Sequence, residues 1–223
     1  MKIVAITSSP KGKKSNTLQL VNAAIEGARE AGAEAEVIDI TKHQIKYCKG
    51  CVTCYKKGKC VQKDDFQEIW DKIIGADGII LSSPNYIDNV SAQLKTLFDR
   101  MANAIHEQLF DGKYALTLTT AGGSGDDVVL GVMNTFIGKC GGMVVGSASA
   151  LGRDGPEGME AAVKRSHGLG KELVKAIKAK KKYPEQAAAH KAWKDSFVFS
   201  LKANKEKWAH NYQHWVEKGW IKA

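Results

Sequence analysis

The chain begins with the stretch that decides its fold, Met1-Lys2-Ile3-Val4-Ala5-Ile6-Thr7-Ser8-Ser9-Pro10-Lys11-Gly12-Lys13-Lys14-Ser15-Asn16-Thr17. The apolar run at Lys2–Thr7 predicts a first strand. A polar loop with hydroxyl groups and lysines follows it, and a helical pattern then covers residues 16–31. A strand, a loop and a helix in this order predict the first β-α unit of a parallel sheet.

The same alternation recurs to about residue 180. Further strands are predicted over residues 35–40, 78–83, 115–120 and 142–147. The helical patterns between and after them cover residues 65–74, 90–105, 126–139 and 157–179. The predicted strands are continuous runs rich in Val, Ile and Leu, as expected when both faces of a parallel sheet are covered. We therefore predict an α/β fold with a doubly wound five-stranded parallel sheet, whose ligands bind beyond the carboxyl ends of the strands.

The character of the chain changes after Tyr183-Pro184. The remainder has no strand pattern, yet it holds four of the five tryptophans, Trp193, Trp208, Trp215 and Trp220. We predict one domain over residues 1–183 and a helical, aromatic-rich extension of two helices over residues 184–223. Aromatic residues are enriched at protein interfaces. The extension therefore either mediates oligomerisation or packs on its own domain.

Charge and hydropathy limit the partners and the compartment. The formal net charge is +9, and part of it comes from a lysine-rich run at residues 178–182. Because no nucleic-acid module accompanies this run, we expect a solvated helix end and no nucleic-acid partner. No apolar run is long enough to cross a membrane, and the apolar start is too short for a secretory signal. We expect a cytoplasmic protein whose cysteines are reduced and therefore bind metal or take part in redox chemistry.

Four of the five cysteines lie within a stretch of thirteen residues. Their spacing is C-x2-C-x2-C-x5-C, at Cys48, Cys51, Cys54 and Cys60. This cysteine loop, residues 46–63, can hold an iron–sulfur cluster or a structural zinc, or it can carry free thiols. Its lysines are expected to lower the thiol pKa values and to attract an acidic electron-carrier protein. The remaining Cys140 is predicted to be a buried structural residue.

Three loops follow strand ends at one edge of the predicted sheet. Hydroxyls, a lysine and the helix N-terminus after the first strand form a cradle suited to a phosphate, although neither nucleotide-binding glycine motif is present. After the third strand, an aromatic ring could flank a flat cofactor, and after the fourth, glycines allow close backbone approach. Each loop alone could be simple turn chemistry. No acid–base side chain stands out, so we name no catalytic residue and expect a cofactor to carry the reaction.

Together these loops resemble the flavodoxin-like NAD(P)H-dependent FMN reductase family, over about residues 1–178. The resemblance implies a flavodoxin-like fold and bound FMN, with the phosphate held by Ser9, Lys11, Ser15, Asn16 and Thr17. It implies that one side of the isoalloxazine is lined by Pro84, Asn85, Tyr86 and Ile87, and that its edge meets Thr120, Ala121, Gly122 and Gly123. Lys11 stands where the family commonly has arginine, which keeps the charge but loses bidentate geometry.

The cysteine loop and the Asp64-Asp65 pair after it resemble the iron–sulfur flavoprotein branch of that family. This implies a 4Fe–4S cluster on the four loop cysteines and electrons that pass from a ferredoxin-like donor through FMN to dioxygen, peroxide or a quinone. It also implies a homodimer or homotetramer. Two alternatives stay open: a cluster-free FMN or quinone reductase with NAD(P)H as donor, and a non-enzymatic flavin electron carrier with a zinc or thiol loop.

Overall fold

The computed structural model describes residues 1–222 and places five parallel strands in the order β2-β1-β3-β4-β5. The strands are β1 (Lys2–Thr7), β2 (Glu34–Asp39), β3 (Gly78–Pro84), β4 (Tyr114–Ala121) and β5 (Met143–Leu151). The helices are α1 (Asn16–Glu30), α2 (Thr53–Lys57), α3 (Phe66–Ile74), α4 (Ala92–Arg100), α5 (Ala102–His106), α6 (Asp126–Lys139), α7 (Gly155–Lys178), α8 (Pro184–Ala203) and α9 (Ala209–Glu217). The predicted doubly wound parallel sheet is confirmed.

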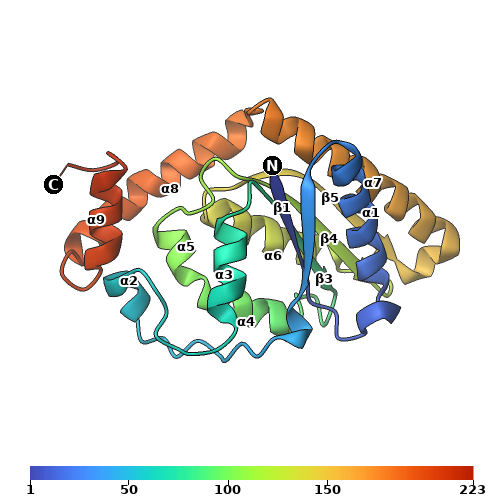
Figure 1. Cartoon of the computed structure of the whole chain (residues 1–223), viewed down its shortest axis with the longest axis horizontal. Coiled ribbons are helices and arrows are strands. Elements are labelled where there is room, and N and C mark those ends of the chain that lie inside the picture. Colours follow the sequence, from blue (N-terminus) through green and yellow to red (C-terminus); the bar gives the residue numbers. More distant parts are fainter. Residues whose placement is uncertain (223) are drawn as a thin grey trace.

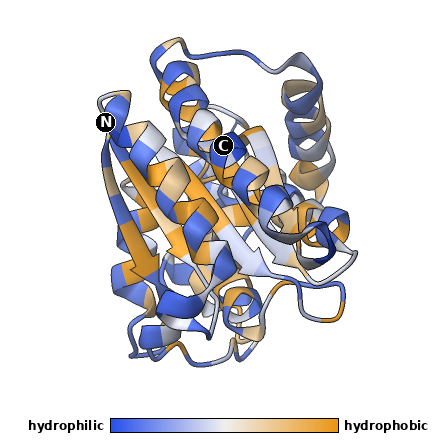
Figure 2. Cartoon of the chain, turned by 90° about the vertical axis from the view of Figure 1, so that its right-hand side faces the viewer, coloured by the Kyte–Doolittle hydropathy of each residue, from blue (hydrophilic) through white to orange (hydrophobic). Residues whose placement is uncertain are grey.

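Helices cover both faces of the sheet, with α1 and α7 on one face and α3 to α6 on the other (Figure 1). Because consecutive strand residues point to opposite faces, Ile3 and Ala5 of β1 pack toward α1 and α7, whereas Val4 and Ile6 pack into the other core. Figure 2 shows hydrophobic residues along some of the strands, while the helices carry both hydrophobic and hydrophilic residues. This is the pattern that buries a parallel sheet on both sides.

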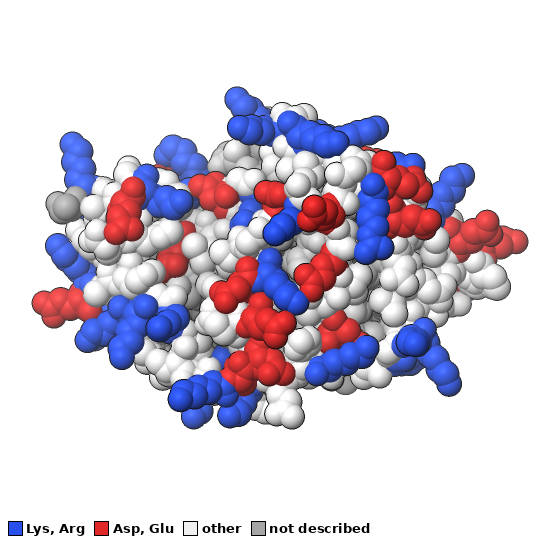
Figure 3. Space-filling view, in the orientation of Figure 1, with Lys and Arg blue, Asp and Glu red and all other residues white. Residues whose placement is uncertain are grey.

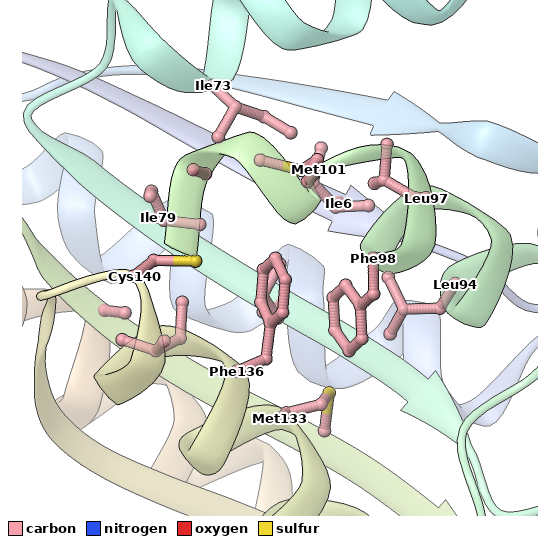
Figure 4. Close-up of a cluster of buried hydrophobic side chains, with 14 of the residues drawn as sticks. Ile6, Ile73, Ile79, Leu94, Leu97, Phe98, Met101, Met133, Phe136 and Cys140 are labelled. Carbon is pink, nitrogen blue, oxygen red and sulfur yellow. The ribbon is translucent and has the colours of Figure 1, made fainter. Parts of the chain in front are cut away.

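The core beneath α4 and α6 is aromatic. The rings of Phe98 and Phe136 stack with their centroids 3.8 Å apart, beside Met133 (Figure 4). Cys140 lies in the same core and is fully buried, and this burial raises the pKa of its thiol well above the usual value. The predicted structural role of Cys140 is therefore confirmed.

Two element boundaries differ from the sequence-based prediction. The strand predicted over residues 142–147 extends to Leu151, because its ladder with β4 continues to the pair Ala121 and Leu151. The single helix predicted over residues 90–105 is interrupted at Met101, where ψ is 14° instead of the helical value of about −42°. The interruption separates α4 from α5.

The extension forms the two predicted helices, α8 and α9, and has a small core of its own. Leu201, Tyr212 and Trp215 are buried there, and the partly buried Trp193 and Trp208 pack around them. In Figure 1, α8 leads away from the sheet and α9 lies beside α2. Within residues 1–222, no helix is long and apolar enough to cross a membrane.

Candidate functional site

The loop after β1 forms a polar cradle at the carboxyl end of the sheet. Ser15 caps α1, accepting a hydrogen bond from the Leu18 backbone N–H at 3.2 Å. The hydroxyl of Thr17 lies 2.6 Å from that of Thr120, which ties the start of α1 to the end of β4. Backbone N–H groups at a helix N-terminus attract anions. The cradle therefore presents a positive dipole end and the Lys11 ammonium to one side of the site.

The loop after β3 forms the next wall. The Asn85 backbone N–H donates to Thr120 O at 2.8 Å, and its side-chain amide donates to Ser124 O at 2.9 Å. Tyr86 follows and is exposed. Ile87 and Asp88 then have φ values of +54° and +51° at the tip of the loop. A β-branched residue with positive φ is rare, so the hydrogen bonds of Asn85 hold a strained turn beside the site.

The end of β5 closes the site next to the end of β4. The Arg153 backbone N–H donates to Gly122 O at 2.9 Å. Gly152 lies so close to this strand that a Cβ would sit 3.0 Å from the same oxygen. A side chain here would push the two loops apart, so glycine allows the close approach.

These loops surround a cavity of about 450 Å³. It falls in the range of small-molecule sites, roughly 300–1,000 Å³. Nearly all of the residues predicted to bind FMN line it: Ser9, Lys11, Ser15, Asn16, Thr17, Pro84, Asn85, Tyr86, Thr120, Ala121 and Gly122. Ile87, whose side chain is fully exposed, and Gly123 are not among the described lining residues.

The contribution of β5 and the start of α7 to the cavity was not predicted from the sequence. Additional lining residues come mainly from there: Lys14, Ala150, Leu151, Gly152, Gly155, Pro156 and Met159. The predicted fifth strand ended at Ser147, which placed its carboxyl end too early. These residues could have been found from the parallel arrangement of the strands. Because every strand of a parallel sheet has its carboxyl end at the same edge, the loop after the fifth strand must also lie beside the site.

The cysteine loop leaves the same edge of the sheet after β2. Cys48 and Cys51 are exposed, whereas Cys54 in α2 and Cys60 are partly buried. Within residues 1–222, no three or more His, Cys, Asp and Glu side chains are gathered so that they could hold a metal ion. The loop therefore supplies four thiols without a preformed coordination shell.

The thiols nevertheless influence one another. Burial, and then repulsion from Cys60, Cys48 and Cys51, raises the pKa of Cys54 to about 11. The pKa of Cys51 is lowered, mainly by hydrogen bonds from Thr53, with a smaller contribution from Lys49. The expectation that lysines lower the thiol pKa values is thus wrong at Cys54, where desolvation and neighbouring thiols dominate, and at Cys51 the contribution of Lys49 is minor beside the hydrogen bonds of Thr53.

A buried ion pair anchors the end of the loop. Arg100 Nη1 and Nη2 donate to the two carboxylate oxygens of Asp64 at 2.6 and 3.1 Å, and both side chains are almost completely buried. Burial alone would raise the pKa of Asp64, but hydrogen bonds from Arg100 and from backbone N–H groups outweigh it and lower the pKa. Nη2 also donates to Cys60 Sγ at 3.4 Å. Arg100 was not among the site residues predicted from the sequence.

Two buried donors beside the cysteines lack partners. Arg100 Nε and Asn103 Nδ2 have no hydrogen-bond partner among the described residues, and both side chains line a small cavity with Cys54 and Cys60. Buried polar atoms are nearly always paired. Sulfur anions held by these cysteines would be suitable acceptors, so the donor set and its surroundings fit an iron–sulfur cluster.

Basic side chains surround the cysteine loop. It carries Lys46, Lys49, Lys56, Lys57, Lys59 and Lys63. Figure 3 shows a group of Lys and Arg side chains over the region where α2 lies in Figure 1. Such a surface offsets negative charge on the loop.

The chain is similar to known families and proteins. Residues 1–155 match the family of the NADPH-dependent FMN reductases. An iron–sulfur flavoprotein of Archaeoglobus fulgidus is 33% identical over 99% of this chain and 100% of its own length. An iron–sulfur flavoprotein of Methanosarcina thermophila is 43% identical over 45% of this chain and 52% of its own.

Solved structures share the fold. An NAD(P)H:quinone oxidoreductase from Methanothermobacter marburgensis superposes with a TM-score of 0.63 at 21% identity, covering 78% of this chain and 96% of its own. A flavodoxin, WrbA-like protein from Agrobacterium tumefaciens superposes with a TM-score of 0.57 at 18% identity, covering 81% and 99%. These likenesses show the flavodoxin-like architecture.

Proposed function

Because the chain belongs to the NADPH-dependent FMN reductase family and to its iron–sulfur flavoprotein branch, we propose that it transfers electrons between a 4Fe–4S cluster on its cysteine loop and FMN. The chain is a flavin-dependent oxidoreductase, as its family is. The observation that carries the finer proposal is the placement of four thiols and two unpartnered N–H donors on and beside one loop.

The cavity at the carboxyl end of the sheet is the proposed FMN site. The cradle of Ser9, Lys11 and the start of α1 would hold the phosphate, through hydroxyls, an ammonium and backbone N–H groups. The loops after β3 and β4 would position the ring system between Tyr86 and Gly122. Bound FMN supplies the ability to accept electrons singly and to release them as pairs.

The cysteine loop is the proposed cluster site. Cys48, Cys51, Cys54 and Cys60 would supply the four thiolates that a 4Fe–4S cluster needs. Positive charge from the loop lysines would offset the charge of the bound cluster. Bound there, the cluster supplies one-electron transfer.

Partners are inferred from the same charges. The lysines of the loop favour an acidic, ferredoxin-like protein as the electron donor. The acceptor proposed for FMN is a small molecule, namely dioxygen, peroxide or a quinone. We further propose a homodimer or homotetramer in the cytoplasm.

The deciding experiment is the ultraviolet–visible spectrum of the anaerobically purified protein, with iron, sulfide and zinc analysis of the same sample. We expect a broad absorbance beneath the flavin bands and about four iron and four sulfide per chain. A clean flavin spectrum without iron, unchanged after anaerobic reconstitution, would contradict the cluster. Zinc in place of iron would support the electron carrier with a zinc loop.

The runner-up function is a cluster-free NAD(P)H-dependent FMN or quinone reductase. It is favoured by the cysteine loop itself, whose thiols are not gathered into a coordination shell within the described residues. Cys51→Ala separates the two functions, with Cys140→Ala as a control that removes a thiol outside the loop. Under our proposal Cys51→Ala loses iron and keeps FMN, whereas NAD(P)H oxidation unaffected by Cys51→Ala would favour the runner-up.

A further inference from the structure

We propose that Arg100 and Asn103 donate hydrogen bonds to the sulfur atoms of the cluster and thereby raise its reduction potential, and that Asn211 of the C-terminal extension holds Asn103 in position. The inference rests on the proposed function, because it needs a cluster on the cysteine loop. It concerns three residues outside the loop, on α4, α5 and α9.

The guanidinium of Arg100 is fixed in one orientation. Nη1 donates to Lys46 O at 2.8 Å and to Asp64 Oδ2 at 2.6 Å. Nη2 donates to Asp64 Oδ1 at 3.1 Å and to Cys60 Sγ at 3.4 Å. Arg100 Cζ also lies over the Phe66 ring, 4.4 Å from its centroid. With these contacts the fork cannot rotate, so the position of its remaining donor, Nε, is determined.

That remaining donor has no partner. Nε is buried and makes no hydrogen bond within residues 1–222. An unpaired donor on a buried cation is costly. A sulfur acceptor in the cavity lined by Arg100, Cys54 and Cys60 would satisfy it.

Asn103 supplies the second donor. Its Oδ1 accepts a hydrogen bond from Asn211 Nδ2 at 2.7 Å, and this contact assigns the other end of the amide as Nδ2. Nδ2 is buried and unpartnered in the described part of the chain. Asn103 lines the same small cavity as Arg100, Cys54 and Cys60. The two residues with unpartnered donors therefore border one small cavity, which two of the loop cysteines also line.

Asn211 is itself held in place. It is fully buried and also donates to Glu107 Oε1 at 2.8 Å, while its Oδ1 lies 3.1 Å from His106 Nδ1. The extension thus reaches the proposed cluster through a chain of two amides. This gives the extension a positioning role at the site.

Hydrogen bonds to cluster sulfurs stabilise the reduced state, which carries one more negative charge. Removing such a donor should therefore make the midpoint potential more negative. The reduction potential of FMN in the same molecule should stay unchanged. Neither Arg100 nor Asn103 is among the described residues that line the cavity proposed for FMN, here called the flavin cavity.

The test is a redox titration of the reconstituted holoprotein, with the cluster followed by electron paramagnetic resonance and FMN by absorbance. Asn103→Leu keeps the approximate volume and removes the donor, and we expect a negative shift of the cluster potential alone. Asn211→Leu should shift it in the same direction. Gln67→Leu is the matched control, because Gln67 lines the same cavity but already donates to Asp71 at 2.8 Å; its cluster potential should equal that of the wild type.

An unchanged cluster potential in Asn103→Leu would overturn the inference, as would an equal shift of cluster and FMN. If Asn103→Leu does not fold, Asn103→Ala serves instead, because it also removes the donor without adding charge, and a failure of its potential to fall would have the same meaning. A wild-type protein that takes up no iron and sulfide would refute the proposed function, and the inference with it. Cluster uptake with no effect of the variants would refute the inference alone.

Discussion

At the scale of single residues, the polar cradle in the loop after β1 gives the most direct test of where the FMN phosphate binds. Replacing Lys11 and Ser15 by alanine removes an ammonium and a hydroxyl from the cavity. Hydrogen bonds to charged groups contribute about 1.5–3 kcal/mol each, so we expect FMN to bind at least about tenfold more weakly. Lys13→Ala is the control, because Lys13 lies in the same loop and is not among the cavity-lining residues described. The measurement is a fluorescence titration of apoprotein with FMN, and equal affinities would refute the placement of the phosphate.

Most of the residues that line the cavity proposed for FMN were predicted from the sequence, because they lie at strand ends or in the loops and helix starts that follow. A prediction of strand ends therefore also predicts the loops that meet at that edge, although the early end given to the fifth strand left out Ala150, Leu151 and Gly152. Arg100 and Asn103 could not be predicted in this way. Their importance lies in contacts with Cys60 and Asn211, which are distant in sequence, and no spacing rule connects them.

At the scale of elements, the contact between α2 and α9 can be tested through Gly58. This glycine ends α2 with φ of +75°, and a Cβ would collide with the His210 ring of α9. Gly58→Ala should therefore unfold at lower denaturant concentration than the wild type, with a loss of about 1–3 kcal/mol from strain together with the clash. The collision has little room to relax, because Glu107 Oε1 holds His210 Nδ1 at 2.6 Å.

Gly50→Ala is the matched control for this substitution. Gly50 lies in the same loop with φ of +61°, and no described atom lies within 4 Å of its would-be Cβ. It therefore reports the backbone strain alone. A denaturant titration in which both variants lose the same stability would show that α9 does not constrain the cysteine loop.

Element types were predictable from hydrophobic periodicity, whereas two boundaries were not. The fifth strand runs past Ser147 because β4 offers it hydrogen-bond partners, although Ala148-Ser149-Ala150 has weak strand preference. The interruption at Met101 leaves Arg100 as the last residue of α4, where it pairs with Asp64. Contacts with residues distant in sequence determine both boundaries, and hydrophobic periodicity carries no information about such contacts.

At the scale of the whole molecule, the sheet order brings both proposed cofactor sites to one edge. The flavin cavity lies at the ends of β1, β3, β4 and β5, and the cysteine loop follows β2, the neighbour of β1. The sequence predicted this edge for the three loops that follow β1, β3 and β4, but it made no such prediction for the cysteine loop. It also predicted an extension of two helices, but not that the extension packs against α2 and α5, because aromatic composition alone does not say what the rings contact.

Docking of the extension should depend on pH through His106. Its ring stacks on Tyr55 of α2 with centroids 3.9 Å apart, lies 4.8 Å from the rings of Phe197 and Trp208, and contacts Asn211. Burial lowers the pKa of His106 to about 4, from an ordinary value of 6.5. The neighbouring Tyr55, with a pKa of about 12, stays neutral over the same range.

Because the unfolded chain binds a proton at His106 near pH 6.5 and the folded chain only near pH 4, the free energy of unfolding should fall as pH drops through this window. The loss should reach at most about 3 kcal/mol and level off below pH 4. His106→Phe keeps a ring in the stack and cannot titrate, so its stability should fall less over the same range. Denaturant titrations followed by tryptophan fluorescence at several pH values provide the measurement. Carboxylates protonate in both proteins, so parallel losses of stability would mean that His106 is not buried as a neutral ring between the extension and the cysteine loop.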